Sequence, residues 1–157
     1  MTPRAEAIPH SGIREIFDIA MGMPGVVHLE IGEPDFDTPK SIVHAAHMAA
    51  CSGRTHYTAN AGIEELRTAI AKWLSTSLGQ PVSHWNVLVT AGATEASLIA
   101  FLTPLSPGDQ VLLPSLAWPN YQSQLQLVGA ESIPVPLCAS DDFALSVTAS
   151  ENVTLTP

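Results

Sequence analysis

Residues 87–96 read Val-Leu-Val-Thr-Ala-Gly-Ala-Thr-Glu-Ala, and the other predicted elements can be placed around this segment. It opens with three aliphatic residues, a short run of the kind found in buried strands. Gly92 allows a tight turn after this run, and the apolar sequence from about Ala93 to Leu102 predicts a helix. A buried strand that passes directly into a helix is typical of α/β folds.

The downstream sequence repeats this alternation. Residues 111–113 predict a second strand, residues 119–128 a helix, and residues 132–137 a third strand. The turn before the second strand is Ser106-Pro107-Gly108-Asp109, which has proline and glycine at its centre. Strands and helices that alternate at this spacing imply right-handed crossovers and a parallel sheet with helices on both faces.

The first part of the chain predicts three helices and one short strand. A helix is expected to start near Ser11, and residues 26–31 predict the strand. Thr38 and Pro39 are expected as the N-cap and first residue of a second helix, which runs to about Cys51. A third helix follows Gly62, because apolar residues then recur at helical spacing: Ile63, Leu66, Ile70, Trp73 and Leu74.

Composition excludes several classes of protein. The chain has 157 residues, a formal net charge of −9 and 46% hydrophobic residues, so it is neither a disordered acidic tail nor a typical nucleic-acid-binding protein. No apolar run reaches the ~18 residues of a membrane span, and the N-terminal sequence has no signal-peptide core. We therefore expect one soluble, cytoplasmic domain, with Cys51 and Cys138 as buried apolar side chains.

Two segments at the predicted carboxyl edge of the sheet are candidates for ligand binding. The helix that begins near Gly92 offers N–H groups and a positive dipole end to a phosphate, and the Thr94 hydroxyl adds a donor. Trp118 follows the next strand, where its indole can stack on a flat heteroaromatic cofactor. The alternatives are that Thr94 only caps the helix and that Trp118 only completes the core.

Other candidates are weaker when taken alone. Gly32 can present its N–H to a carboxylate or can simply be required by a turn, and Tyr57 is a surface or packing residue by default. His44 and His47 share a helix face, but no third ligand follows them, so no metal site is predicted.

Taken in order, five segments resemble the pyridoxal-phosphate-dependent aminotransferases of class I/II, which have fold-type I. The segments are residues 29–39, 57–67, 89–96, 107–111 and 118–121. The resemblance covers about residues 11–145. It implies a three-layer α/β/α parallel-sheet domain that is truncated in this chain. Residues 1–40 then form an N-terminal segment, and residues 41–157 form the first half of the large cofactor-binding domain.

The resemblance also implies a role for each matching residue. Ala93 and Thr94 hold the phosphate of pyridoxal 5′-phosphate, with Gly92 permitting the turn. Trp118 stacks on the cofactor ring and borders the substrate. Gly32 binds the substrate α-carboxylate through its N–H, and Tyr57 reaches across a homodimer interface to the neighbouring subunit's cofactor phosphate.

The expected activity is transfer of an amino group from an amino acid to a 2-oxo acid. That reaction needs a lysine that carries the cofactor and moves the Cα proton, and this chain has only Lys40 and Lys72. Neither lies in the segment where the family keeps that lysine, so no catalytic residue is assigned and the chain alone is expected to be inactive. The alternative is a non-catalytic binding or assembly module derived from such a domain, and a generic nucleotide-binding domain is a third, weaker possibility.

Overall fold

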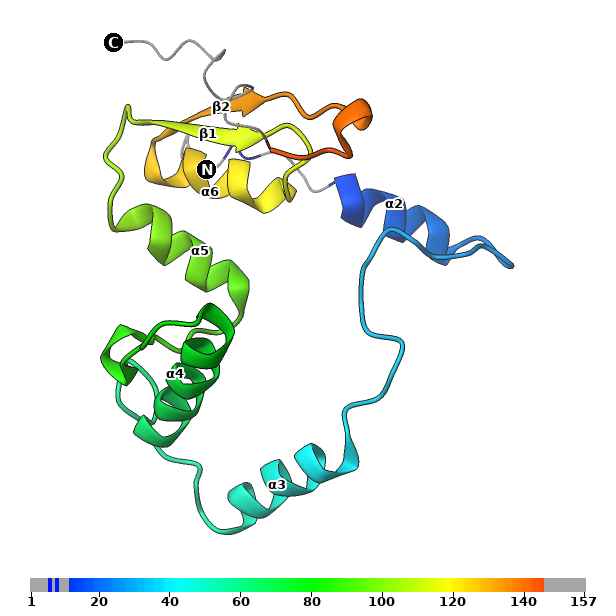
Figure 1. Ribbon diagram of the computed structural model, residues 1–157. Helices are drawn as coiled ribbons and strands as arrows, with labels where there is room; N and C mark the ends of the chain where they lie inside the picture. The colour runs from blue at the N-terminus through cyan, green and yellow to red at the C-terminus, as the bar shows by residue number, and fades with distance from the viewer. Residues whose placement is uncertain (1–5, 7, 9–11, 146–157) are drawn as a thin grey trace. The chain divides into compact units, whose positions relative to one another are not determined.

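The computed structural model describes residues 6, 8 and 12–145, and contacts divide the chain into two compact units. One unit is Ile31–Ala91, and the other combines Met1–Glu30 with Gly92–Pro157. Figure 1 shows the helices and strands of both units in sequence colours.

The unit Ile31–Ala91 is helical. It contains α3 (Lys40–Cys51), α4 (Glu64–Leu78) and the short 3-10 helix η1 (His84–Asn86). These helices confirm the two that the sequence predicts here. The start of α3 differs in one detail, because Pro39 and not Thr38 occupies the N-cap and no side chain caps the helix. Proline has no side-chain acceptor, so it caps only through its carbonyl, which accepts from the N–H groups of Ile42 (2.9 Å) and Val43 (3.2 Å).

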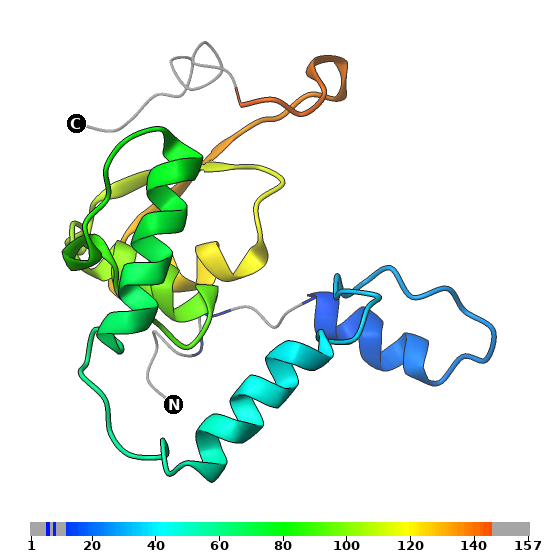
Figure 2. The same cartoon turned by 60° about the horizontal axis from the view of Figure 1, so that its bottom comes forward.

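Arg67 joins α4 to the segment that follows it. Its side chain is only 8% exposed, and it donates from Nε to the Val87 carbonyl (2.9 Å) and from Nη2 to the His84 carbonyl (2.7 Å). The guanidinium also lies 5.4 Å from the centre of the Trp85 ring. Figure 2 shows this segment returning alongside α4. A buried arginine is stable here because backbone carbonyls accept its hydrogen bonds.

Residues 87–89 do not form the predicted strand. In the described part of the chain they belong to no sheet, and the Val89 N–H donates to the Ala61 carbonyl at 3.0 Å. Gly62 packs closely on the Val89 side chain, since a Cβ at Gly62 would lie 2.7 Å from it. The apolar run is thus held in an extended conformation by side-chain packing and Arg67, without a strand partner.

The other unit carries the sheet. It contains α2 (Gly12–Met21), α5 (Ala93–Leu102), β1 (Gln110–Pro114), α6 (Pro119–Val128), β2 (Glu131–Val135) and η2 (Ala139–Asp141). β1 and β2 are parallel, with Gln110 opposite Glu131 and Pro114 opposite Val135. The prediction of a parallel sheet with helical crossovers is confirmed, whereas the strand predicted over residues 26–31 is wrong, because the structure has no strand there.

α6 covers one face of this two-stranded sheet (Figure 1). The core consists of Leu125, Val128 and Ala130, and residues of α5, β1 and the connection between them pack against it: Leu98, Phe101, Leu105 and Val111. Leu125 is fully buried. Because α5 and α6 share this core, the packing of apolar side chains fixes the position of one helix against the other.

Two turns that contain glycine, one before β1 and one after α6, are joined by a hydrogen bond. Gly108 has a φ of 95°, and the Asp109 N–H donates to the Ser106 carbonyl at 3.1 Å, as the Pro-Gly sequence predicts. Gly129 ends α6 with a φ of 83°, and its carbonyl accepts from the Gly108 N–H at 2.9 Å. The end of α6 is thereby tied to the turn that starts β1.

Two other sequence expectations concern exposure. Cys51 and Cys138 are both exposed free thiols, so the expectation that they are buried is wrong. Cys51 lies on the surface of α3, a helix that buries none of its residues, and its Sγ is 3.6 Å from Nε2 of His47. Among the residues that the structure describes, no helix is both long and apolar enough to cross a membrane.

Glu30 should titrate at a lower pH than an isolated glutamate. Its carboxylate oxygen Oε1 lies 2.6 Å from Nδ1 of His28, and this hydrogen bond lowers the pKa of Glu30. Because the folded pKa is depressed, the bond stabilises the fold above the unfolded pKa and is lost as pH falls through the folded pKa. Carboxyl NMR titration should show the Glu30 pKa rising toward its ordinary value in His28→Ala. The control His56→Ala should leave it unchanged, and an unchanged pKa in His28→Ala would contradict the assignment.

Candidate functional site

The N-terminus of α5 is shaped by Gly92. This residue is the N-cap, with φ 83° and ψ 176°, and no side chain caps the helix. A Cβ at Gly92 would meet nothing within 4 Å, so space does not require glycine there. The positive φ does require it, because L-residues rarely adopt that conformation. The sequence Ala-Gly-Ala-Thr therefore turns sharply before the helix begins.

Thr94 lies inside the first turn of α5 and does not cap it. Its carbonyl accepts hydrogen bonds from the Ser97 hydroxyl (3.1 Å) and from Nε2 of Gln124 (2.8 Å). Within the described residues, the N–H groups of Ala93 and Thr94 have no hydrogen-bond partner, and both residues are exposed. Exposed donors at the positive end of a helix dipole are suited to bind an anion. Of the two readings of Thr94, helix capping is excluded and phosphate binding stays a prediction.

Trp118 is the residue immediately before α6, four positions after β1 ends. Pro119 occupies the first position of α6 and thereby fixes the backbone that follows the indole. The indole packs edge-on against Tyr121, with ring centres 5.5 Å apart, and Tyr121 packs edge-on against Phe101 of α5. Trp118 remains 39% exposed, so it only partly completes the core. Its remaining surface is available to a ligand.

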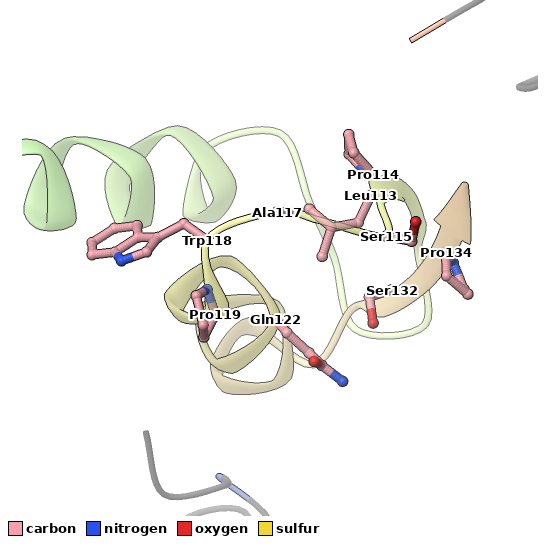
Figure 3. Close-up of a pocket in the computed structure, with 9 residues that line it drawn as sticks. All are labelled: Leu113, Pro114, Ser115, Ala117, Trp118, Pro119, Gln122, Ser132 and Pro134. Atoms are coloured by element: carbon pink, nitrogen blue, oxygen red, sulfur yellow. The ribbon is translucent and has the colours of Figure 1, made fainter. Parts of the chain in front are cut away.

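A cavity of about 200 Å³ lies beside Trp118, at the end of β1. Figure 3 shows the indole turned away from Ser115 and Ser132, which lie at the other end of the cavity. Gly92, Ala93 and Thr94 do not line it. In Figure 1, α5 and α6 both run opposite to β1, so both helices begin on the side where β1 ends. The tip of α5 and Trp118 therefore both lie toward the end of the unit where β1 ends.

Gly32 and Tyr57 belong to the other unit, Ile31–Ala91. Gly32 has no positive φ, and a Cβ added to it would meet nothing within 4 Å, so neither its backbone nor packing explains a glycine there. Tyr57 is fully exposed and packs on nothing that would hold it as a core residue. It lines an open depression of about 450 Å³ together with Arg54 and His56, and these polar groups suit an anionic ligand.

Neither lysine lies at the α5 tip or next to Trp118 in sequence. Lys40 is the first residue of α3, and Lys72 lies on α4. The described residues contain no group of three side chains that could hold a metal ion, and His44 and His47 therefore gain no third ligand.

Sequence reasoning missed two buried polar residues, Gln124 and Arg67, that bond to backbone carbonyls. Gln124 contacts the first turn of α5, and Arg67 holds the segment that leads to it. A signal for Gln124 was available, because it occupies the inward stripe of α6 that also contains Tyr121, Leu125 and Val128. Arg67 gave no comparable signal, since arginine on a helix is usually exposed.

Comparisons of the sequence with a family model and with curated proteins agree on one family. Residues 24–155 match the family described as aminotransferase class I and II. The aspartate aminotransferase of Pyrococcus horikoshii is 42% identical over 140 residues, which is 89% of this chain and 36% of that protein. The aromatic-amino-acid aminotransferase 2 of Thermococcus litoralis is 36% identical over 148 residues, which is 94% of this chain and 38% of that protein. The chain therefore spans little more than a third of the length of these curated relatives.

Solved structures agree with the sequence matches. The structure of aspartate aminotransferase from Thermus thermophilus with maleate superposes with a TM-score of 0.92 at 29% identity. It is matched over 99% of this chain and 42% of its own length. The fold class predicted from the sequence, that of fold-type I enzymes, is confirmed. The chain belongs to the aminotransferase class I and II family and corresponds to the N-terminal portion of its relatives.

Proposed function

We propose that this chain is the phosphate-binding and ring-stacking part of a pyridoxal-phosphate-dependent aminotransferase. The observation that carries the proposal is the tip of α5, where a Gly92 with φ 83° exposes the donors of Ala93 and Thr94. Within this proposal, residues 1–40 are the N-terminal segment and residues 41–157 the first half of the large domain. The cytoplasmic location expected from the sequence stays a prediction.

The residues present fit the cofactor. The N–H groups of Ala93 and Thr94 and the Thr94 hydroxyl would bind the phosphate, and the dipole of α5 would stabilise its charge. The exposed surface of Trp118 would cover the ring and keep water away from it. When bound, the cofactor supplies a conjugated ring that accepts electrons from the substrate Cα.

Two further roles are proposed for residues of the unit Ile31–Ala91, one for Gly32 and one for Tyr57. The Gly32 N–H would bind the α-carboxylate of the amino acid or 2-oxo acid, and the open space around it leaves room for that group. Tyr57 would donate its hydroxyl to the cofactor phosphate of a second subunit in a homodimer, which agrees with its complete exposure. These roles give a reason for the glycine at position 32 and for the exposed tyrosine at position 57, which contacts within the unit Ile31–Ala91 do not explain.

Turnover requires a lysine that this chain does not supply. Lys40 and Lys72 lie on α3 and α4, where the family has no catalytic lysine, so the chain alone is expected to be inactive. The alternative, a non-catalytic module, predicts that the half-site has lost cofactor binding and that a complementary half cannot restore activity.

A chimera tests the proposed function. Residues 1–145 of this chain would replace the matching segment of the Pyrococcus horikoshii aspartate aminotransferase, which is 42% identical over 140 residues. The chimera should transaminate, and Trp118→Ala should lower its kcat/KM by roughly 100-fold through loss of ring alignment. Steady-state kinetics with aspartate and 2-oxoglutarate would measure this.

Trp73→Ala is the matched control, because Trp73 is also largely exposed but lies on α4, in the unit Ile31–Ala91. It should leave kcat/KM within about twofold of the chimera. A folded chimera that binds no pyridoxal phosphate would favour the non-catalytic module. If Trp118→Ala and Trp73→Ala lowered kcat/KM equally, the role assigned to Trp118 would be wrong.

A further inference from the structure

Gln124 is a polar side chain in the interior of the sheet-bearing unit. It is 5% exposed and lies on α6 next to the fully buried Leu125. Its Nε2 donates to the Thr94 carbonyl at 2.8 Å. Its Oε1 is buried, and in the described structure no donor reaches it.

Burying the Gln124 side chain with its Oε1 unpaired costs free energy that a residue with only a packing role would not incur. Tyr121, Gln124, Leu125 and Val128 share the inward face of α6, where an aliphatic side chain would leave no buried polar atom unsatisfied. Gln124 makes one cross-helix bond and leaves its own carbonyl without a partner. The bond to Thr94 is therefore what a glutamine at this position provides and a leucine would not.

The bond acts on the turn that carries the anion donors. The Thr94 carbonyl belongs to the planar peptide group that joins Thr94 to Glu95, so holding its oxygen fixes the orientation of that group. The Ser97 hydroxyl bonds to the same oxygen from within α5, whereas Gln124 bonds to it from another helix. Gln124 thus anchors the first turn of α5 to the core of the unit.

We propose that Gln124 is a positioning residue that holds the first turn of α5 in the geometry that binds the cofactor phosphate. It acts through Thr94 and does not touch the ligand. The inference rests on the proposed function, since it assumes that a phosphate binds at this helix tip.

The test uses the 157-residue chain and follows backbone amides by NMR during titration with inorganic phosphate and with pyridoxal phosphate. In the wild type, the NMR signals of the Ala93 and Thr94 amides should shift as either ligand is added, and the shifts should reach a plateau. Gln124→Leu keeps the volume but removes the donor, and it should raise both dissociation constants roughly fivefold to tenfold.

Gln126→Leu is the matched control. Gln126 lies on the same helix and also has a buried Oε1 without a partner in the described residues, but no bond joins its side chain to α5. It should leave phosphate binding unchanged. Urea unfolding of both variants separates affinity from stability, because a purely structural role would make affinity follow stability in both.

Gln124→Glu gives a second, pH-dependent readout. A carboxylate cannot donate to the Thr94 carbonyl, whereas a protonated carboxyl can. Sulfate, whose charge is constant over the range, should bind Gln124→Glu weakly at neutral pH and regain wild-type affinity in acid. The wild type and Gln124→Leu should show no such recovery.

The outcomes separate the inference from the function on which it rests. If wild-type amides at the α5 tip respond to neither phosphate nor pyridoxal phosphate, both the proposed function and the inference are overturned. If the wild type responds and Gln124→Leu binds equally well, the inference is overturned and the proposed function stands. Equal weakening in Gln124→Leu and Gln126→Leu would also overturn the inference.

Discussion

Replacing Arg67 with leucine should lower the unfolding free energy of the unit Ile31–Ala91 by about 4 kcal/mol. The substitution removes two hydrogen bonds from a charged donor, to the carbonyls of Val87 (2.9 Å) and His84 (2.7 Å). The Val87 residue is itself buried, so water cannot readily replace the lost donor. Contact with Trp85 is lost as well. Few other bonds hold the segment against α4, and we therefore expect it to detach first.

Urea unfolding measured by tryptophan fluorescence checks this result. In a Trp118→Phe background the remaining tryptophans, Trp73 and Trp85, report on the unit Ile31–Ala91 alone. Arg67→Lys keeps the charge but loses the forked donor, and its stability should lie between those of the wild type and Arg67→Leu. Arg54→Leu is the control, because Arg54 is exposed. Equal midpoints for Arg67→Leu and the wild type would contradict the role given to Arg67.

The secondary structure around the sheet was predictable because its signals are local. α5 and α6 begin and end where the sequence predicts them, since Gly92, Pro119 and Gly129 mark their ends. The strands predicted over 87–89 and 26–31 are absent from the described structure, although their residues suit strands. A strand forms only beside a partner, and local sequence does not reveal whether one is present.

The candidate site was predictable only in its outline. The glycine turn and the tryptophan could be predicted because Gly92 precedes an apolar helical run and Trp118 follows a predicted strand. The exclusion of Thr94 as a cap required the structure, which gives the N-cap to Gly92. Gln124 and Arg67 act through backbone carbonyls 30 and 20 residues away in the chain. The position of Gln124 on the inward stripe of α6 predicts that it is buried, but the identity of its partner depends on tertiary packing.

Pyridoxal phosphate should bind reversibly to this chain and quench Trp118, without attaching to a specific lysine. Lys40 and Lys72 lie on α3 and α4, and the proposed function expects no catalytic lysine at either position. The free cofactor accepts energy from a nearby indole, so quenching reports its proximity to Trp118. Borohydride reduction followed by peptide mass analysis should therefore find no adduct at a single site.

The variant Gly92→Val tests whether binding depends on the α5 tip, and the ligand pyridoxal tests whether it depends on the phosphate. Valine cannot easily adopt the φ of 83° that Gly92 has, so the variant should distort the α5 tip and raise the dissociation constant at least roughly tenfold. Pyridoxal has the same ring without the phosphate and should bind much more weakly. A Gly25→Val control alters another glycine with positive φ, far from α5 in sequence, and should leave quenching unchanged.

The most direct measurement is competition between pyridoxal phosphate and inorganic phosphate, followed by Trp118 fluorescence in the chain that carries Trp73→Phe and Trp85→Phe. If one small molecule contacts both the α5 tip and the indole, quenching will saturate and inorganic phosphate will reverse it. Quenching that fails to saturate, or that phosphate leaves unchanged, would mean that the helix tip and the tryptophan do not share a ligand.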